Sequence, residues 1–185
     1  MKKILPLSFF DRPTLDVARD LLGASIVRRW RGRELSLVIT EVEAYDGPRD
    51  RASHASRGRT PRTRIMFGPP GRFYVYFTYG MHWLVNIVTG PDDYPAAILI
   101  RAGKYYDAKK QAWISVNGPA RLTKFLHIAK AQNGNIANPK HGLWFEDRGT
   151  AVAKENIMVG KRIGVDYAEP VWKNKLYRFG FDYQG

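Results

Sequence analysis

The chain has 185 residues, 44% of them hydrophobic and 13% aromatic, which is enough apolar content to fold around a core. Thirty Lys and Arg against seventeen Asp and Glu give a net charge of +13, a balance typical of proteins that bind nucleic acid. The absence of cysteine excludes disulfides, thiolate zinc sites and cysteine-ligated clusters, and no apolar run is long enough to span a membrane.

The N-terminal part predicts one helix and one β-hairpin. Residues 14–22 have the apolar stripe of an amphipathic helix, and Gly23 is well placed to end it. Residues 25–30 and 34–44 predict a hairpin that turns at Arg31-Gly32. No signal-peptide pattern precedes them, so we expect an intracellular protein, cytoplasmic and nucleoid-associated if the source is a prokaryote.

The second strand of this hairpin carries two glutamates in register with aliphatic side chains. Alternate positions share one face of a strand, and this set comprises Leu35, Leu37, Ile39, Glu41 and Glu43. Unless a bulge resets the face, at least one carboxylate is carried toward the apolar side. Burying it unpaired is costly, so it should gain a cationic partner or rise in pKa.

Residues 46–72 form the most unusual segment of the chain, with seven arginines, no lysine and two acids. So cationic a segment needs an anionic partner, and arginine forks suit phosphate oxygens. Its length exceeds that of an ordinary loop, which indicates a functional one. We expect Arg57, Arg59, Arg62 and Arg64 to contact a nucleic-acid backbone.

Aromatic strands follow. Residues 73–79 and 82–89 predict an antiparallel pair that turns at Gly80-Met81. Buried phenols need hydrogen-bond partners, so several of these tyrosines suit a polar pocket, where two opposed rings could hold an extruded base. Asn86 is an amide among aliphatic positions, which indicates an assigned partner or a recognition role.

The remaining pattern predicts a strand over 96–101, a helix over 120–131, a loop over 133–142 and closing strands over 157–165 and 176–181. Arg101 ends the first of these strands and is a natural counter-ion for a carboxylate. With no internal repeat and no linker, we expect one α+β domain over residues 1–185, built around a largely antiparallel sheet with flanking helices.

The cluster of acids near the arginine-rich segment allows three interpretations. The acids could balance neighbouring arginines, or they could hold Mg²⁺ or Mn²⁺ as in a nuclease, although their spacing matches no dedicated metal motif. Alternatively, one glutamate could act as a general base on a water that cleaves an N-glycosidic bond. Glu43, at the strand end beside Tyr45, is the best candidate, and we expect it to share a cavity with tyrosine rings.

A series of short motifs in collinear order carries a family resemblance. It consists of Leu21-Leu22-Gly23, Glu41-Val42-Glu43-Ala44-Tyr45, Arg51-Ala52-Ser53-His54, residues 60–67, residues 70–81, Val85-Asn86-Ile87, Leu99-Ile100-Arg101, residues 117–123 and Arg162-Ile163-Gly164-Val165. Together they resemble the alkyladenine (3-methyladenine) DNA glycosylases, monofunctional enzymes that remove alkylated and deaminated purines. Residues 103–115 lack a close counterpart, and residues 172–179 diverge.

The resemblance implies a role for each matching position. Glu43 would activate the nucleophilic water, which Arg101 and the main-chain carbonyl of Ile163 would help to position. Tyr45 and Tyr76 would stack on the flipped base, and His54 would read its edge. Asn86 would clash with the 2-amino group of guanine. Tyr79 would intercalate into the duplex, with Met81 beside it.

The resemblance also implies a monomer that needs no metal or cofactor and acts on double-stranded DNA containing damaged purines, among them 3-methyladenine, hypoxanthine and ethenoadenine. Two other function classes stay open. A purely binding module, such as a ribosome- or RNA-associated basic protein, accounts for the charge but not for Glu43 or Asn86. A bifunctional lyase would need a lysine nucleophile, and residues 46–72 contain none.

Overall fold

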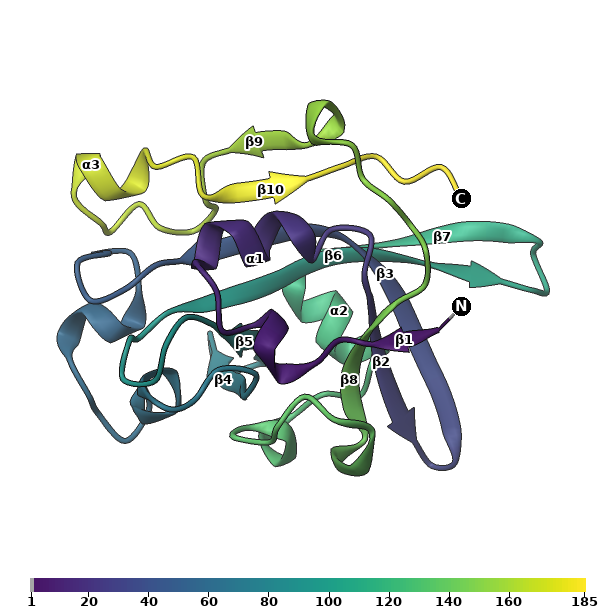
Figure 1. The fold of residues 1–185 in the computed structure, drawn as a ribbon, viewed down its shortest axis with the longest axis horizontal. Coiled ribbons are helices and arrows are strands. Elements are labelled where there is room, and N and C mark those ends of the chain that lie inside the picture. The colour runs from purple at the N-terminus through teal and green to yellow at the C-terminus, as the bar shows by residue number, and fades with distance from the viewer. Residues whose placement is uncertain (1) are drawn as a thin grey trace.

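The computed structural model describes residues 2–185, whose strands form one sheet (Figure 1). The strands are β1 Lys3–Ile4, β2 Ser25–Trp30, β3 Arg33–Tyr45, β4 Phe73–Thr78, β5 His82–Val88, β6 Ala97–Asp107, β7 Ala112–Asn117, β8 Leu143–Asp147, β9 Met158–Gly160 and β10 Arg178–Gly180. The main path runs β1-β8-β2-β3-β6-β5-β4, while β7 pairs with β6 and the β9–β10 ribbon joins β3. Neighbouring strands are antiparallel.

Three α-helices flank the sheet: α1 Thr14–Asp20, α2 Pro119–Phe125 and α3 Pro170–Lys173. Helix α1 packs against β3 and β6, and α2 packs against β5, β6 and β7. The expected α+β fold around a largely antiparallel sheet is therefore confirmed. In Figure 1 the arginine-rich segment and α3 lie at the same end of the molecule, where β3 ends and β6 begins.

The N-terminal elements agree closely with the sequence pattern. Strand β2 has the predicted bounds, β3 extends the predicted strand by one residue at each end, and α1 ends two residues early. Gly23, three residues beyond the end of α1, adopts φ 82°, and a Cβ there would lie 2.6 Å from the Thr150 carbonyl oxygen. Only glycine satisfies both the left-handed conformation and this close approach.

A β-bulge in β3 decides which way Glu43 points. The pairing of β3 with β6 shifts register between Ile39 and Glu41 and again between Glu41 and Val42. Before the bulge Leu37 and Ile39 face the hydrophobic core, and after it Val42 and Ala44 do. The bulge therefore resets the face, and it turns Glu43 away from the aliphatic side chains with which strict alternation would group it.

Two C-terminal predictions were too long. The helix predicted over 120–131 ends at Phe125, because His127 adopts φ 49° and stacks on Trp30 with ring centroids 3.6 Å apart. The strand predicted over 157–165 is reduced to β9, beyond which the chain turns inward at Arg162.

The sheet also contains strands that the sequence pattern did not predict. The strand predicted over 96–101 continues to Asp107 and pairs with β7, which makes a long hairpin. Strand β8 follows the predicted loop and inserts between β1 and β2. No helix in residues 2–185 is long and apolar enough to cross a membrane.

Candidate active site

The arginine-rich segment 46–72 is an ordered loop that its own polar side chains hold together. The Asp50 carboxylate accepts hydrogen bonds from the backbone N–H groups of Asp46 and Ala52, each at 3.1 Å. The segment contains two 3-10 turns, His54–Arg57 and Arg64–Phe67. These turns anchor the loop on the sheet, because Ala55 and Met66 pack in an apolar cluster with Tyr74, Val88 and Ala97.

A cavity of about 900 Å³ lies between this segment, the strands β4 to β6 and residues 163–169. This volume falls within the range of small-molecule pockets, roughly 300–1,000 Å³. The residues lining it include Tyr45, His54, Tyr74, Tyr76, Tyr79, Asn86, Arg101, Ile163 and Tyr167. The cavity therefore brings together residues that are more than 100 positions apart in the sequence, most of them aromatic or hydrogen-bonding.

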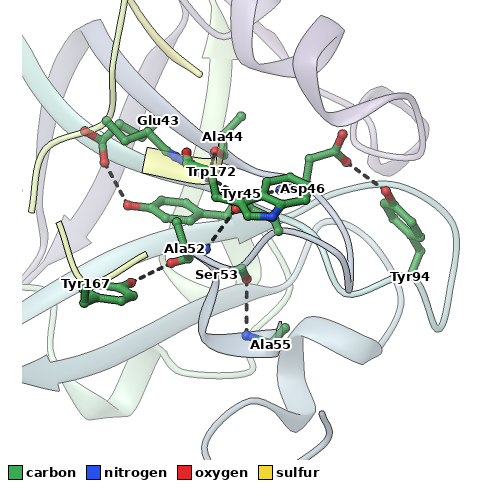
Figure 2. A network of polar contacts seen from close by, with 12 residues as sticks. Glu43, Ala44, Tyr45, Asp46, Ala52, Ser53, Ala55, Tyr94, Tyr167 and Trp172 are labelled. Carbon is green, nitrogen blue, oxygen red and sulfur yellow. Dashed lines mark hydrogen bonds and ion pairs between the residues drawn. The ribbon is translucent and has the colours of Figure 1, made fainter. Parts of the chain in front are cut away.

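Glu43 lies at the end of β3 with three donors around its carboxylate. The Ile163 N–H donates to Oε1 at 2.7 Å, and the Tyr45 hydroxyl donates to Oε2 at 2.9 Å (Figure 2). Arg101 Nη1 lies 3.3 Å from Oε1. Arg101 is thus the cationic partner that the strand pattern required, and it comes from β6, the neighbour of β3 in the sheet.

Glu43 does not itself line the cavity. Its side chain is 0% exposed, although Tyr45, Arg101 and Ile163 all reach the cavity wall. Burial raises the pKa of the Glu43 carboxyl, while Arg101 and the two hydrogen-bond donors hold it down. The expectation that Glu43 shares the cavity with tyrosine rings is therefore wrong for this structure. The carboxylate lies behind Tyr45, which forms the cavity wall in front of it.

Arg101 retains an unused donor beside this carboxylate. Its side chain is 12% exposed, and its Nε is buried without a hydrogen-bond partner among residues 2–185. Buried donors in proteins are almost always satisfied by protein or by water. Glu41 Oε1 lies 3.8 Å from this Nε, so the Arg101 guanidinium is shared between Glu41 and Glu43.

The aromatic wall of the cavity is formed by Tyr45, Tyr74, Tyr76 and His54. The His54 ring meets Tyr76 edge to face with centroids 4.7 Å apart, and His54 Nδ1 lies 3.1 Å from the Tyr74 hydroxyl. Burial, with Arg62 and Arg57 nearby, lowers the pKa of His54 to about 4. Burial raises the pKa of Tyr76, so the rings of this wall are neutral at ordinary pH.

Asn86 comes from the middle of β5 and points into the cavity with Leu84. Its Nδ2 donates to the Tyr74 carbonyl oxygen at 3.0 Å, which gives the buried amide the assigned partner that its position required. The amide oxygen of Asn86, Oδ1, accepts no hydrogen bond from residues 2–185.

Tyr79 lies at the tip of the β4–β5 hairpin and is 81% exposed, while the neighbouring Met81 is 68% exposed. Tyr79 also reaches the cavity edge. Its φ of 51° places a bulky residue in the left-handed region, a strained conformation that clusters at functional sites. The hairpin therefore presents two large apolar side chains to solvent at the mouth of the cavity.

The four arginines predicted to contact DNA are all exposed, but their surroundings differ. Arg57 and Arg62 line the cavity, and the Arg62 guanidinium lies 5.0 Å from the centre of the Tyr76 ring. Arg59 forms an ion pair with Asp93. Arg64, in the second 3-10 turn, is exposed on the same loop.

The other acids near the cavity are also paired, and Glu41 shares Arg101 with Glu43. Arg178 Nη1 donates to Glu41 at 2.8 Å, the Tyr94 hydroxyl donates to Asp46 at 3.1 Å (Figure 2), and Asp50 pairs with Arg162. Among residues 2–185, no three His, Asp or Glu side chains gather in an arrangement that could hold a metal ion. The interpretation that the acids balance nearby arginines thus describes Glu41 and Asp50.

Two residues at this site had no role in the sequence analysis. Tyr167 lines the cavity at 65% exposure, and its hydroxyl donates to the Ala52 carbonyl oxygen at 2.6 Å (Figure 2). Arg162 is buried behind Tyr45. The available signal was Asp50, an acid inside a loop of arginines, together with the motif that begins at Arg162.

Comparisons with known proteins agree with this site. The family model described as methylpurine-DNA glycosylase matches residues 8–184. A protein of Methanocella arvoryzae is 47% identical over 176 residues, covering 89% of this chain and 86% of that protein. One from Streptomyces avermitilis is 44% identical, covering 87% and 81%, and one from Myxococcus xanthus is 44% identical, covering 94% and 88%. All three carry the name "Putative 3-methyladenine DNA glycosylase".

Proposed function

The chain belongs to the methylpurine-DNA glycosylase family, and from this premise we propose that it removes alkylated or deaminated purines from double-stranded DNA. A DNA glycosylase hydrolyses the N-glycosidic bond between a base and its sugar, the first step of base excision repair. The product is an abasic site. Lesions of the 3-methyladenine, hypoxanthine and ethenoadenine class are purines that fit a cavity of about 900 Å³.

Glu43 is the general base of this proposal. The bond between C1′ and the purine nitrogen breaks with its electrons on the base, a water oxygen bonds to C1′, and Glu43 accepts the water proton. Arg101 supports this role, because its guanidinium opposes the rise in the pKa of Glu43 that burial causes. The carboxylate also stabilises the positive charge that develops on the sugar.

Water must reach Glu43 for this reaction, and Tyr45 controls that access. Oε1 already accepts from Ile163, while Oε2 accepts only from the hydroxyl of Tyr45, a residue that lines the cavity. We propose that the Tyr45 hydroxyl stays on Oε2 when a flipped base stacks on its ring, and that the water takes the second lone pair of the same oxygen. The Ile163 N–H, as well as its carbonyl, then belongs to the water site.

The cavity wall supplies recognition in this proposal. Tyr45 and Tyr76 stack on the base, an interaction worth roughly 1–3 kcal/mol per base and comparable with the cost of flipping. His54 and Asn86 face the base edge, and Asn86 rejects guanine because its amide would meet the 2-amino group. Tyr79 fills the space that the flipped nucleotide leaves in the duplex, with Met81 beside it.

The observation that carries the proposal is the Glu43–Arg101–Tyr45 group directly behind a tyrosine-lined cavity. Its test is Glu43→Gln, which keeps the shape of the side chain but removes the base. We expect affinity for lesion DNA within about tenfold of the unaltered protein and a single-turnover rate at least about a hundredfold lower. Full activity in this variant would end the assignment of Glu43.

Two further assays separate the other function classes. Incubation with a hypoxanthine-containing duplex followed by alkali should break the strand at the lesion, whereas a purely binding protein leaves it intact; activity that persists in EDTA argues against a metal-dependent nuclease. We also propose a monofunctional enzyme, since none of the described cavity residues is a lysine. Borohydride should therefore trap no covalent complex.

A further inference from the structure

Arg162 is a buried cation that joins three separate segments. Its side chain and that of Asp50 are each 0% exposed, and the pair is bidentate, with Nη1 on Oδ2 and Nη2 on Oδ1. Nη1 also donates to the Ala44 carbonyl oxygen at 2.9 Å, and Nη2 to that of Trp172 at 3.1 Å. One guanidinium therefore fastens the end of β3, the arginine-rich loop and helix α3 together.

Both hydrogen-bond donors to Glu43 are direct neighbours of this guanidinium. Ile163 follows Arg162 in the chain, and its N–H reaches Oε1 at 2.7 Å. Tyr45 supplies the donor to Oε2, and its ring centre lies 4.8 Å from the Arg162 guanidinium. Ala44, whose carbonyl oxygen accepts from Arg162, is the residue between Glu43 and Tyr45. Any movement of Arg162 therefore moves the groups that surround the proposed base.

We propose that the Arg162–Asp50 pair is a positioning device of the active site, which holds the Ile163 N–H and the Tyr45 hydroxyl on the two oxygens of Glu43. The inference rests on the proposed function, because it assigns the pair to the base of that reaction. Neither side chain touches the substrate, so both act through other residues.

The chemistry of the pair favours positioning over stability. A fully buried ion pair contributes little net stability, because the cost of removing both charges from water offsets their attraction. A bidentate guanidinium–carboxylate pair, however, fixes orientation as well as distance, which a lysine cannot do. Asp50 is itself fixed by two backbone N–H groups of its loop. The pair is thus a rigid link between loop and strand.

The consequence concerns the ionisation of Glu43. Burial raises the pKa of its carboxyl, whereas Arg101, the Ile163 N–H and the Tyr45 hydroxyl lower it. The titratable and charged groups facing Glu43 or contributing to its field are Glu41, Tyr45, Tyr76, Arg101 and Arg162, with Arg178 opposite it in β10. If both hydrogen bonds are lost, burial dominates and the pKa rises further. The acidic limb of the rate profile then moves to higher pH.

The test uses Arg162→Lys and Asp50→Asn in the full-length protein, with single-turnover release of hypoxanthine from a duplex measured between pH 5 and 9. We expect the acidic limb to move up by about one pH unit and the plateau rate to fall by about ten- to a hundredfold. Lesion-DNA affinity should change by less than about tenfold, because the pair does not touch DNA.

Two comparisons separate positioning from general stability. The matched control is Arg148→Lys, which alters the pair with the buried Glu146 on β8, and we expect no displacement of the acidic limb there. The double variant Asp50→Asn, Arg162→Gln leaves no unpaired buried charge, so its melting temperature should recover relative to the single variants. Its acidic limb should nevertheless stay displaced.

A purely structural role predicts that activity returns with stability in the double variant, and that result would overturn the inference. So would a wild-type acidic limb in any folded variant of the pair. If the unaltered protein releases no base from any lesion duplex, the proposed function fails instead, which is a distinguishable outcome.

Discussion

His54 is the one histidine in the cavity wall, and its protonation state limits what the site can do chemically. Its pKa is lowered to about 4 by burial and by the positive charges of Arg62 and Arg57. Above pH 5 the ring is therefore neutral, so it can hydrogen-bond a base edge but cannot act as a general acid. A cationic 3-methyladenine leaves without protonation, whereas neutral hypoxanthine must take its proton elsewhere.

We therefore predict that the imidazole signal of His54 titrates near pH 4 in proton NMR spectra, assigned through its loss in His54→Asn. A midpoint near the ordinary value of about 6.5 would contradict this account. The rate profile for hypoxanthine release should keep its shape in His54→Asn even if its height falls. Folding stability should also decrease as pH falls from about 6.5 to 4, because only the unfolded chain binds the proton there.

Glu43 shows what a single residue reveals in sequence and what it does not. Strict periodicity placed Glu43 on the aliphatic side, from which the bulge turns it away, but the side chain is still buried, and Arg101 supplies the cation that a buried charge needs. The layer of Tyr45 between Glu43 and the cavity depends on a side-chain hydrogen bond between residues two apart on one face. Periodicity alone places both side chains on that face but does not reveal the bond.

At the level of elements, the β4–β5 hairpin is built to present Tyr79. The turn holds it at φ 51°, so its ring projects from the tip at 81% exposure. We predict that Tyr79→Ser weakens binding to a lesion duplex more than binding to the corresponding single strand, since only a duplex has a stack to fill.

The comparison is made by fluorescence anisotropy with both substrates. Tyr106→Ser is the matched control, because Tyr106 is an exposed tyrosine on the β6–β7 hairpin and does not line the cavity. Equal losses of Tyr79→Ser on duplex and single strand would refute the intercalating role.

The close packing beside the bulge in β3 leads to a prediction about stability. Gly103 pairs with Ile39 beside the bulge, and a Cβ there would lie 2.7 Å from the Val38 carbonyl oxygen. Gly103→Ala should therefore cost about 1–3 kcal/mol of unfolding free energy, measured in urea. Gly68→Ala is the control, since its nearest contact is 3.4 Å, and equal destabilisation of both would show that the close approach is unimportant.

Sequence patterns predicted the elements whose periodicity and turn residues agree, such as β2 and β3 with their Arg31-Gly32 turn. They failed where a contact between residues distant in the sequence sets the end of an element. The stacking of His127 on Trp30 ends α2, and the ion pair of Arg162 with Asp50 ends β9. The β6–β7 hairpin was missed because its turn contains neither glycine nor proline, and Gln111 takes the positive φ instead.

At the level of the whole molecule, the cations that make up the net charge of +13 have different environments. Some cations are internal to the fold, as Arg162 is, and others are already paired, as Arg59 is with Asp93. Arg57 and Arg62 are exposed at the cavity, and in the proposed function they are the cations that contact phosphate. Composition alone predicts an anionic partner, and the fold shows which cations are buried, paired or exposed.

DNA binding should accordingly depend strongly on salt, and the dependence should be resolvable by residue. Each phosphate contact contributes about 0.9 to the slope of log affinity against log salt concentration. We predict that Arg64→Ala lowers the slope by about that amount. Arg59→Ala should lower it less, because Asp93 already neutralises that guanidinium in the free protein. Lys3→Ala, on β1 at the opposite end of the sheet path from β4, should leave the slope unchanged. Equal effects of Arg64→Ala and Lys3→Ala would mean that net charge, rather than the arginine-rich loop, drives binding.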